Sequence, residues 1–278
     1  MNKNIKKLLI KTKKAVFSQQ IGNNTSKFKG EGYDFVELRE YEDGEDVRKI
    51  DWVISAKMQK PYVKVFHTQR ELNINIVPIL GGSVHFGSTS LKKDIITEIC
   101  AILGYSCVSQ GDSYSSYICN ESVSLNTKKT KKLLGVDRMC DTIDNYKVIG
   151  KKVNYSQITD ELYKQLKKKS IIFLIGDFFS TDNLNLKLLA KKHEVIAIIV
   201  RDKFEEKPSR MGSVNFTDPS SSQVFDGDLN GSLVKEYEKK IKINDYKLYD
   251  NFKKSGVQFS KVYTDDNVMV KMMSLFRG

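Results

Sequence analysis

The chain of 278 residues is 40% hydrophobic, enough for one large core or for a core with a small subdomain, and this excludes a disordered protein. Its 46 basic and 34 acidic side chains give a formal net charge of +12, which would suit an anionic partner. Most of the excess is scattered lysine, and the interleaved arginine and aromatic residues of nucleic-acid grooves are missing. Nucleic acid is therefore not an expected partner.

Residues 1–27 are predicted to contain a basic amphipathic helix, and lysines break every apolar run in this segment. We expect the helix to pack on its own domain. The alternative is a helix lying on an anionic membrane, attracted through Lys3, Lys6 and Lys7. No signal-peptide core is seen, and no window reaches the roughly 20 apolar residues of a spanning helix, so a soluble protein is expected.

Residues 28–72 are predicted to form a small β-rich subdomain. The stretches YDFVELREY and PYVKVFHT have apolar side chains at alternate positions, as half-buried antiparallel strands do. Between them lies the charged stretch EDGEDVRKIDW, in which YEDGED lacks the ligand spacing of a calcium loop and is interpreted as a turn.

Residues 73–278 alternate between predicted strands and helices. The strand INIVPIL is followed by a helix over about residues 91–109, a strand around SYSSYIC and lysine-rich helices between residues 128 and 168. SIIFLIGDFF and EVIAIIV are almost uniformly apolar, as strands buried on both faces of a parallel sheet are. A short hairpin, a long helix ending at Gly256, a strand and a last helix follow. This order predicts a doubly wound, mainly parallel α/β sheet of the Rossmann type.

Ligands of such sheets bind where the strands end, so the turns after Leu80 and around Asp177 matter most. Neither turn carries GxGxxG, GxxxxGK[ST] or GxSxG, which disfavours nucleotide binding and a serine hydrolase. The cysteines form no CxxC pair, so buried, reduced thiols and a cytoplasmic location are expected. They are Cys100, Cys107, Cys119 and Cys140.

The block GEGYDFVELREYEDGEDVRKIDWVISAKMQKPYVKVFHTQREL, residues 30–72, resembles the signature of the bacterial family called domain of unknown function 58. The resemblance continues through LIGDFF, RDKFEEKPSRMGSVNFTD, VYTDDN and LFRG, and so covers the chain from about residue 28 to its end. It implies a von Willebrand factor A-like domain over residues 73–278.

Members of the wider A-domain class hold a metal ion through DxSxS after the first strand, a threonine from a second loop and an aspartate from a third. The matching positions here are Ile79, Gly81, Ser83, Ser156 and Asp177. One carboxylate and two hydroxyls are too few to dehydrate Mg²⁺. We therefore expect no cofactor, with Mg²⁺ possible only if a partner completes the site.

Two alternatives stay open at this degenerate site. His85 could replace a missing ligand, although an exposed or capping histidine is the simpler interpretation. Asp177 could cap a turn through backbone N–H groups or keep a functional role.

The charged signature segment surrounds the only tryptophan of the chain. Its charges could form an ion-pair network that fixes a hairpin against the larger domain, because arginine engages carboxylates bidentately. They could instead form a docking surface, since tryptophan and arginine are common interface anchors. The residues concerned are Glu37, Arg39, Tyr41, Asp46, Arg48, Asp51 and Trp52.

We therefore expect a non-enzymatic protein-interaction module. The resemblance implies a MoxR-type AAA+ ATPase as partner, with this protein as adaptor in the assembly or maturation of a client protein. One alternative is a metal-dependent hydrolase with a rebuilt site that uses Asp177, Asp202 or Asp218. Another is a binder of anionic membranes or nucleic acid driven by the net charge.

Overall fold

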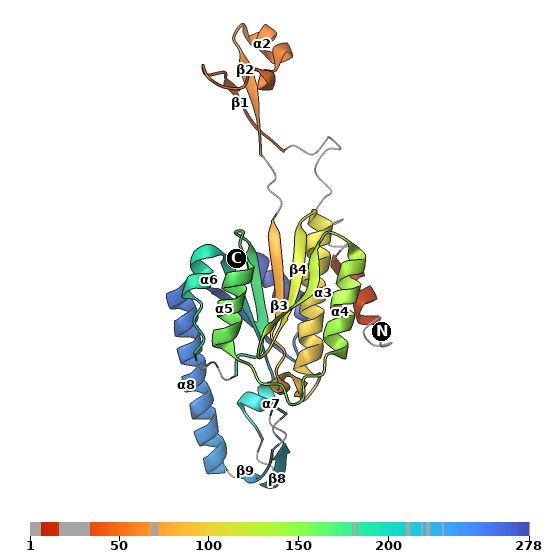
Figure 1. The fold of residues 1–278 in the computed structure, drawn as a ribbon, viewed down its shortest axis with the longest axis vertical. Coiled ribbons are helices and arrows are strands. Elements are labelled where there is room, and N and C mark those ends of the chain that lie inside the picture. Colours follow the sequence, from red (N-terminus) through yellow and green to blue (C-terminus); the bar gives the residue numbers. More distant parts are fainter. Residues whose placement is uncertain are drawn as a thin grey trace. The chain divides into compact units, whose positions relative to one another are not determined.

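The computed structural model describes residues 7–16, 34–67, 72–179, 181, 183–209, 212–217, 219–220, 223–229 and 231–277. The chain divides into two compact units, one formed by residues 1–20 with 72–278 and one by residues 21–71. Figure 1 labels several elements of each unit. The N-terminal helix, residues 7–16, thus belongs to the larger unit.

The smaller unit is built on the predicted antiparallel hairpin of β1 (Asp34–Glu40) and β2 (Tyr62–His67). Between the strands lie η1 (Val47–Lys49) and α2 (Trp52–Met58). The Asp51 side chain begins α2 by accepting hydrogen bonds from the backbone N–H groups of Val53 and Ile54, both at 3.0 Å. The helix ends at Gln59, which adopts a left-handed conformation with φ of 54°.

The larger unit holds a six-stranded sheet in the order β10-β7-β6-β3-β4-β5. Five strands are parallel, and β5 pairs with β4 in the antiparallel sense at one edge. This confirms the predicted mainly parallel α/β sheet beside a small β unit. The strands are β3 (Asn73–Pro78), β4 (Ser113–Cys119), β5 (Val123–Thr130), β6 (Ile171–Gly176), β7 (Glu194–Arg201) and β10 (Gln258–Tyr263).

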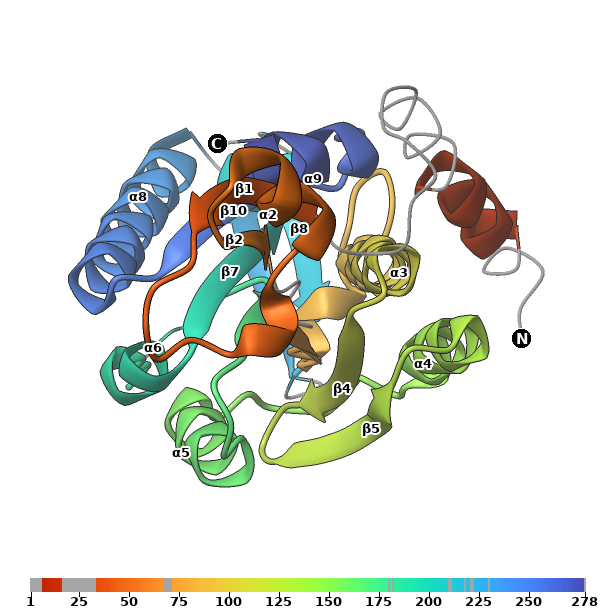
Figure 2. The ribbon, with the colours of Figure 1, turned by 90° about the horizontal axis from the view of Figure 1, so that it is seen from above.

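Helices cover both faces of this sheet (Figure 2). One face carries α3 (Lys92–Gln110), α4 (Leu133–Asn145), α9 (Val268–Arg277) and residues 7–16. The other carries α5 (Tyr155–Gln165), α6 (Lys187–Lys192) and α8 (Gly231–Ser255).

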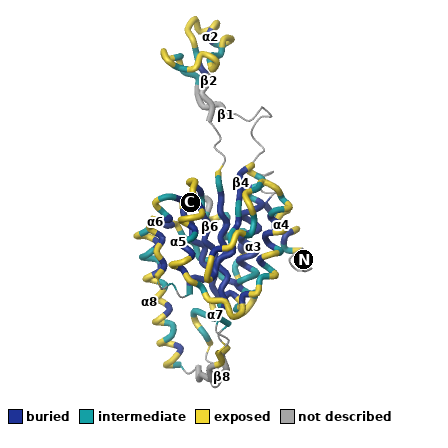
Figure 3. Tube along the Cα trace, viewed as in Figure 1, coloured by how far each residue is buried: buried dark blue, intermediate teal, exposed yellow. Residues whose placement is uncertain are grey.

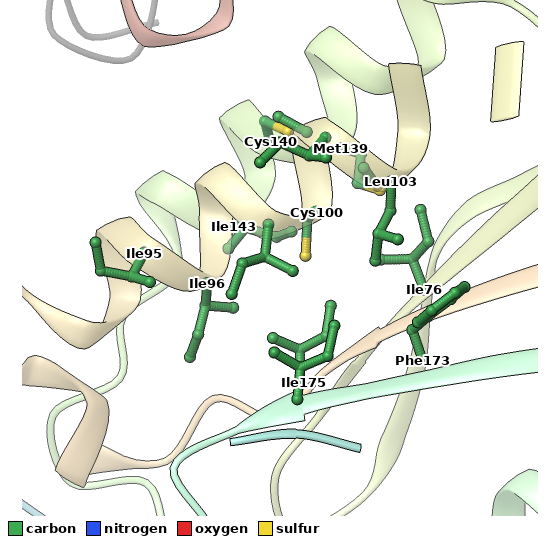
Figure 4. Close-up of a cluster of buried hydrophobic side chains, with 14 of the residues drawn as sticks. Ile76, Ile95, Ile96, Cys100, Leu103, Met139, Cys140, Ile143, Phe173 and Ile175 are labelled. Carbon is green, nitrogen blue, oxygen red and sulfur yellow. The ribbon is translucent and has the colours of Figure 1, made fainter. Parts of the chain in front are cut away.

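Alternate side chains of each central strand enter the two cores, which explains why these strands read as uniformly apolar. In β6, Phe173 and Ile175 face α3, whereas Ile172 and Leu174 face the opposite core. Figure 3 shows burial concentrated in these strands, and Figure 4 shows Ile175 and Phe173 below the side chains of α3 and α4. Leu9 of the N-terminal helix is 3% exposed in the first core, as expected for a helix that packs on its own domain.

The prediction of helical structure from residue 128 onward is wrong at its start, because residues 128–130 belong to strand β5. This segment pairs with β4 at the edge of the sheet, and its lysines suit an exposed edge where further pairing must be discouraged. The later predictions agree with the structure: β8 (Gly212–Thr217) and β9 (Val224–Leu229) form the hairpin. Helix α8 stops before Gly256, whose φ is 69°.

The four cysteines are buried free thiols, as expected. Burial raises the pKa of Cys107 to about 12, so its thiolate is disfavoured at neutral pH. Among the helices that the structure describes, none has an apolar stretch long enough to cross a bilayer.

Candidate functional site: an internal ammonium at the switch point of the sheet

The candidate site lies where the chain turns away from β3 and β6, the two adjacent central strands. From β3 the chain continues through η2 (Gly82–His85) to α3 and then to β4 on one side. From β6 it continues to β7 on the other side. Loops that diverge in this way leave a crevice at the carboxyl ends of the strands, which is where doubly wound sheets bind ligands.

The Gly81-Gly82 turn after β3 is shaped by close approach of neighbouring loops. A Cβ atom on Gly82 would lie 2.4 Å from the carbonyl oxygen of Pro219, and one on Gly81 would lie 2.5 Å from a methyl carbon of Val153. The Gly82 N–H donates to the carbonyl oxygen of Lys151 at 2.8 Å. The turn therefore packs closely against neighbouring loops, and a side chain at position 81 would collide with Val153.

Ile79 is the residue that the resemblance aligns with the first aspartate of the A-domain motif. It is 3% exposed and belongs to the core between the sheet and α5. Its side chain also faces Gly176, where an added Cβ would lie 3.1 Å from that of Ile79. An apolar side chain at this strand end thus extends the core.

The centre of the site is Lys92, the first residue of α3, whose side chain is fully buried. Its Nζ donates to Oδ2 of Asp177 at 3.1 Å and to both carboxylate oxygens of Glu205 at 2.7 and 2.8 Å. The same ammonium lies 5.9 Å from the ring centre of Phe86 and 5.8 Å from that of Phe179. One cation therefore joins the loop after β6 to α7 (Lys203–Glu206).

The two carboxylates respond to this ammonium differently. Burial alone would raise the pKa of Asp177, but Lys92, a hydrogen bond from Ser83 and the charge of Arg201 together hold that pKa below its usual value. For Glu205, burial raises the pKa, and the charge of Asp177 adds to the rise that Lys92 opposes. Lys92 is thus shared by two carboxylates, and the charge of Arg201 also acts to lower the pKa of both.

Asp177 also accepts a hydrogen bond from the backbone N–H of Phe179, at 3.4 Å. It is therefore a turn cap, as the first interpretation of this residue expected, as well as an ion-pair partner of Lys92.

The residues at this position do not fit a divalent metal ion. Mg²⁺ requires about six oxygen ligands at roughly 2.0–2.1 Å, whereas the buried side of Asp177 faces the Lys92 ammonium. Ser156 and His85 are both exposed, the first on α5 and the second on η2. Within the described ranges, histidine, cysteine, aspartate and glutamate side chains form no group of three suited to a metal.

A second charged group supports the site from the end of β7. Arg201 is 1% exposed, and its Nη2 donates to the carbonyl oxygen of Phe178 and to Oδ1 of Asp245, both at 3.0 Å. Its guanidinium carbon lies 4.6 Å from the ring centre of Phe179. The arginine thus ties the loop after β6 to α8.

Asp202, the next residue, is fully buried and engaged by neutral donors. It accepts from the backbone N–H and hydroxyl of Ser88, from the N–H of Phe204 and from the hydroxyl of Thr264, at 2.5–3.0 Å. Burial would raise the pKa of Asp202, but these bonds lower it. The carboxylate is an anchor for three loops.

Several charged residues of the smaller unit pair with one another. Arg48 makes two hydrogen bonds to the Asp46 carboxylate, both at 3.0 Å, and Arg39 pairs with Glu45. The Tyr41 hydroxyl donates to the carbonyl oxygen of Glu45 at 3.1 Å. The side chain of Glu37 lies outside the described residues. These contacts support the ion-pair interpretation for the hairpin itself.

Trp52, by contrast, is 69% exposed, as is its neighbour Val53. An indole that stays exposed does not stabilise the hairpin core, so the docking interpretation keeps its support for this helix.

Sequence reasoning missed Lys92, Glu205 and Arg201. Lys92 stands in the stretch SLKKD, where it resembles the surface lysines found throughout the chain. A usable signal existed for Arg201 and Asp202, because both come directly after the apolar run EVIAIIV, at the carboxyl end of a predicted central strand.

We expect stability to fall in acid as Asp177 and Asp202 become protonated. Because the pKa of each is lower in the folded protein than the roughly 3.9 of an unfolded aspartate, their contribution is complete above about pH 5 and is lost as pH falls through the lowered values. Glu205 acts in the opposite sense. Its pKa is raised in the folded protein, so protonation of this side chain in acid favours the folded state. Urea unfolding measured from neutral pH to about pH 3 gives the free energy of unfolding at each pH. This free energy should fall less steeply in acid for Asp202→Asn than for the exposed control Asp160→Asn. An equally steep fall in the two variants would contradict this role for Asp202.

The fold and the site define a doubly wound α/β protein with a buried lysine at its switch point. The chain belongs to the family described as protein of unknown function DUF58, whose model matches residues 37–246. It is 24% identical over 221 residues to an uncharacterized protein of Mycobacterium bovis and to one of Mycobacterium tuberculosis, which covers 78% of this chain and 70% of each relative.

Two solved structures are similar at 10% sequence identity. One is a conserved hypothetical protein, BatB, from Bacteroides thetaiotaomicron, with a TM-score of 0.43 over 74% of this chain and 96% of that one. The other is an aerotolerance-related membrane protein from Bacteroides fragilis, with a TM-score of 0.45 over 74% of this chain and 100% of that one.

Proposed function

We propose that this protein is a non-enzymatic protein-interaction module of the von Willebrand factor A-like type, in which the Lys92 ammonium replaces the metal ion. The observation that carries the proposal is the fully buried Lys92 side chain between Asp177 and Glu205 at the switch point. A built-in cation gives the loops a fixed shape without a metal. Docking would then depend on the shape and charge of this surface.

The hydrolase alternative would need a free carboxylate. Asp177 is paired with Lys92, and Asp202 is surrounded by hydrogen-bond donors. Asp218, the third candidate, lies outside the described residues. Neither described aspartate is placed to bind a metal or to activate water, which favours a binding function.

The membrane alternative would need a free apolar helix face near the N-terminus. Leu9 and Val16 of that helix are buried in the core of the larger unit. Lys3 and Lys6 lie outside the described residues, and Lys7 begins the described helix. The helix therefore serves its own fold, and we keep a cytoplasmic location as part of the proposal.

We further propose that the partner is a MoxR-type AAA+ ATPase and that the protein acts as its adaptor toward a client. The family resemblance supports this partnership. If Lys92 replaces the metal, the complex must form without divalent ions.

Affinity purification of the tagged protein at low salt and without nucleotide tests both statements. We expect the ATPase to be recovered equally with EDTA and with Mg²⁺, and its ATP hydrolysis to change when the purified protein is added. Failure to recover the ATPase together with unchanged hydrolysis would remove the adaptor role. Recovery that EDTA abolishes would show instead that a metal bridges the partners.

A further inference from the structure

A pocket of about 410 Å³ opens beside the Lys92 site, between α7 and the first turns of α8. Figure 1 shows these two elements at the same end of the larger unit as the β8–β9 hairpin. The apolar walls of the pocket are Phe86, Phe204, Pro208, Leu233 and Tyr237. The Phe86 and Phe204 rings are stacked with their centres 6.4 Å apart. The pocket therefore offers aromatic faces to a side chain that enters it.

The charged residues of the pocket are Glu205, Glu236 and Lys240. The lining thus holds two carboxylates and one ammonium, and Glu205 is in addition paired with the buried Lys92. Glu236 pairs only with the exposed Lys240 among its described contacts, at 2.9 Å, and the two side chains are 62% and 70% exposed. Such an exposed pair is weak, so Glu236 is available to a ligand.

Glu205 connects the pocket to the buried site. Its carboxylate is paired with Lys92, which also contacts Asp177. The side chain of Glu205 is 15% exposed and lines the pocket, so a cation placed there reaches it.

We propose that this pocket binds an arginine side chain of the protein partner, with the aromatic walls around its guanidinium and stem and with Glu205 and Glu236 as its counter-charges. The inference rests on the proposed interaction function and names the chemistry of the partner. It also reverses the polarity of a metal-bearing A-domain, in which the metal takes a partner's acidic side chain.

Arginine suits the pocket better than lysine for two reasons. Its guanidinium is planar, weakly hydrated and able to stack on aromatic rings, and its forked donors can bridge two carboxylates. The protein already uses this combination nearby, since Arg201 lies over the Phe179 ring while it pairs with Asp245.

A titration of the full chain, labelled with ¹³C at its methyl groups, with the peptide acetyl-Leu-Arg-Leu-amide tests the proposal. NMR signals of the Leu233 methyl groups report on binding. Two matched peptides carry citrulline, which is isosteric and neutral, or lysine in place of arginine. We expect shifts at Leu233 with the arginine peptide and about tenfold weaker binding of the citrulline peptide, because a charged pair worth about 1.4 kcal/mol is lost. The lysine peptide should bind at an intermediate level.

The variant Glu236→Gln should weaken binding of the arginine peptide about threefold, as expected for loss of one partly exposed charge pair. Glu238→Gln, on the same helix but outside the pocket lining, should leave it unchanged. Equal binding of the arginine and citrulline peptides, equal effects of the two variants, or no shift at Leu233 would each overturn the proposal. Lysine binding as tight as arginine binding would overturn the choice of arginine.

The two proposals can fail separately. Peptide binding without recovery of the ATPase would keep the pocket and remove that partner. Recovery of the ATPase that Glu236→Gln leaves unchanged, together with no peptide binding, would remove the pocket and keep the adaptor role.

Discussion

Replacing Lys92 by methionine is expected to lower the free energy of unfolding by about 3–5 kcal/mol, the usual effect of removing one partner of a buried ion pair. The reason is that Asp177 and Glu205 would stay in a buried position with no ammonium between them. Methionine keeps most of the lysine volume, so the loss reports on charge more than on packing. Urea unfolding at neutral pH, followed by circular dichroism, measures the change.

Two controls separate this electrostatic effect from general damage. Lys164→Met, at an exposed position on α5, should change the free energy of unfolding by less than about 0.5 kcal/mol. The triple variant Lys92→Met, Asp177→Asn, Glu205→Gln should recover much of the lost stability, because a buried set of neutral groups avoids the uncompensated charges. If Lys92→Met folds as stably as Lys164→Met, the ammonium is not what holds the loops together.

Replacing Arg201 by methionine is expected to cost about 3 kcal/mol of unfolding free energy, since hydrogen bonds to a charged group contribute about 1.5–3 kcal/mol and the arginine is buried. The change leaves the Phe178 carbonyl oxygen without its Arg201 donor and removes one of the two cations that contact Asp245. Lys261, the other cation, continues to pair with Asp245, which limits the loss.

A double-mutant cycle with Asp245→Asn isolates the contribution of the Arg201–Asp245 pair, and we expect a coupling of about 1–3 kcal/mol. Arg138→Met, at an exposed position on α4, serves as the matched control. Arg201 does not join the loop after β6 to α8 if Arg201→Met lowers the free energy of unfolding no more than Arg138→Met does. The same conclusion follows if the effects of Arg201→Met and Asp245→Asn are strictly additive.

The fold was largely predictable because its signals are local and strong. The two apolar runs around Leu174 and Ile198 could be only central strands, and they are adjacent in the sheet. The edge strand β5 was missed because its lysines resemble those of the surface helices, and only its pairing with β4 distinguishes it.

The site was only partly predictable, for a physical reason. Asp177 could be located because it follows a buried strand, but its partner Lys92 comes from 85 residues earlier in the chain and Glu205 from α7. Whether a lysine is buried depends on which carboxylates the fold brings to it, and no local pattern records that. The resemblance to the A-domain motif pointed to Asp177, and the structure adds that a lysine faces this carboxylate.

The measurement that tests the central claim most directly is a calorimetric titration of Mn²⁺ into the purified protein, with Asp177→Ala as the matched variant. If the Lys92 ammonium occupies the position of the metal, we expect only millimolar or weaker binding in both proteins. Micromolar binding to the wild-type protein that disappears in Asp177→Ala would contradict the claim, because it would mean that Lys92 leaves Asp177 and a metal takes its place.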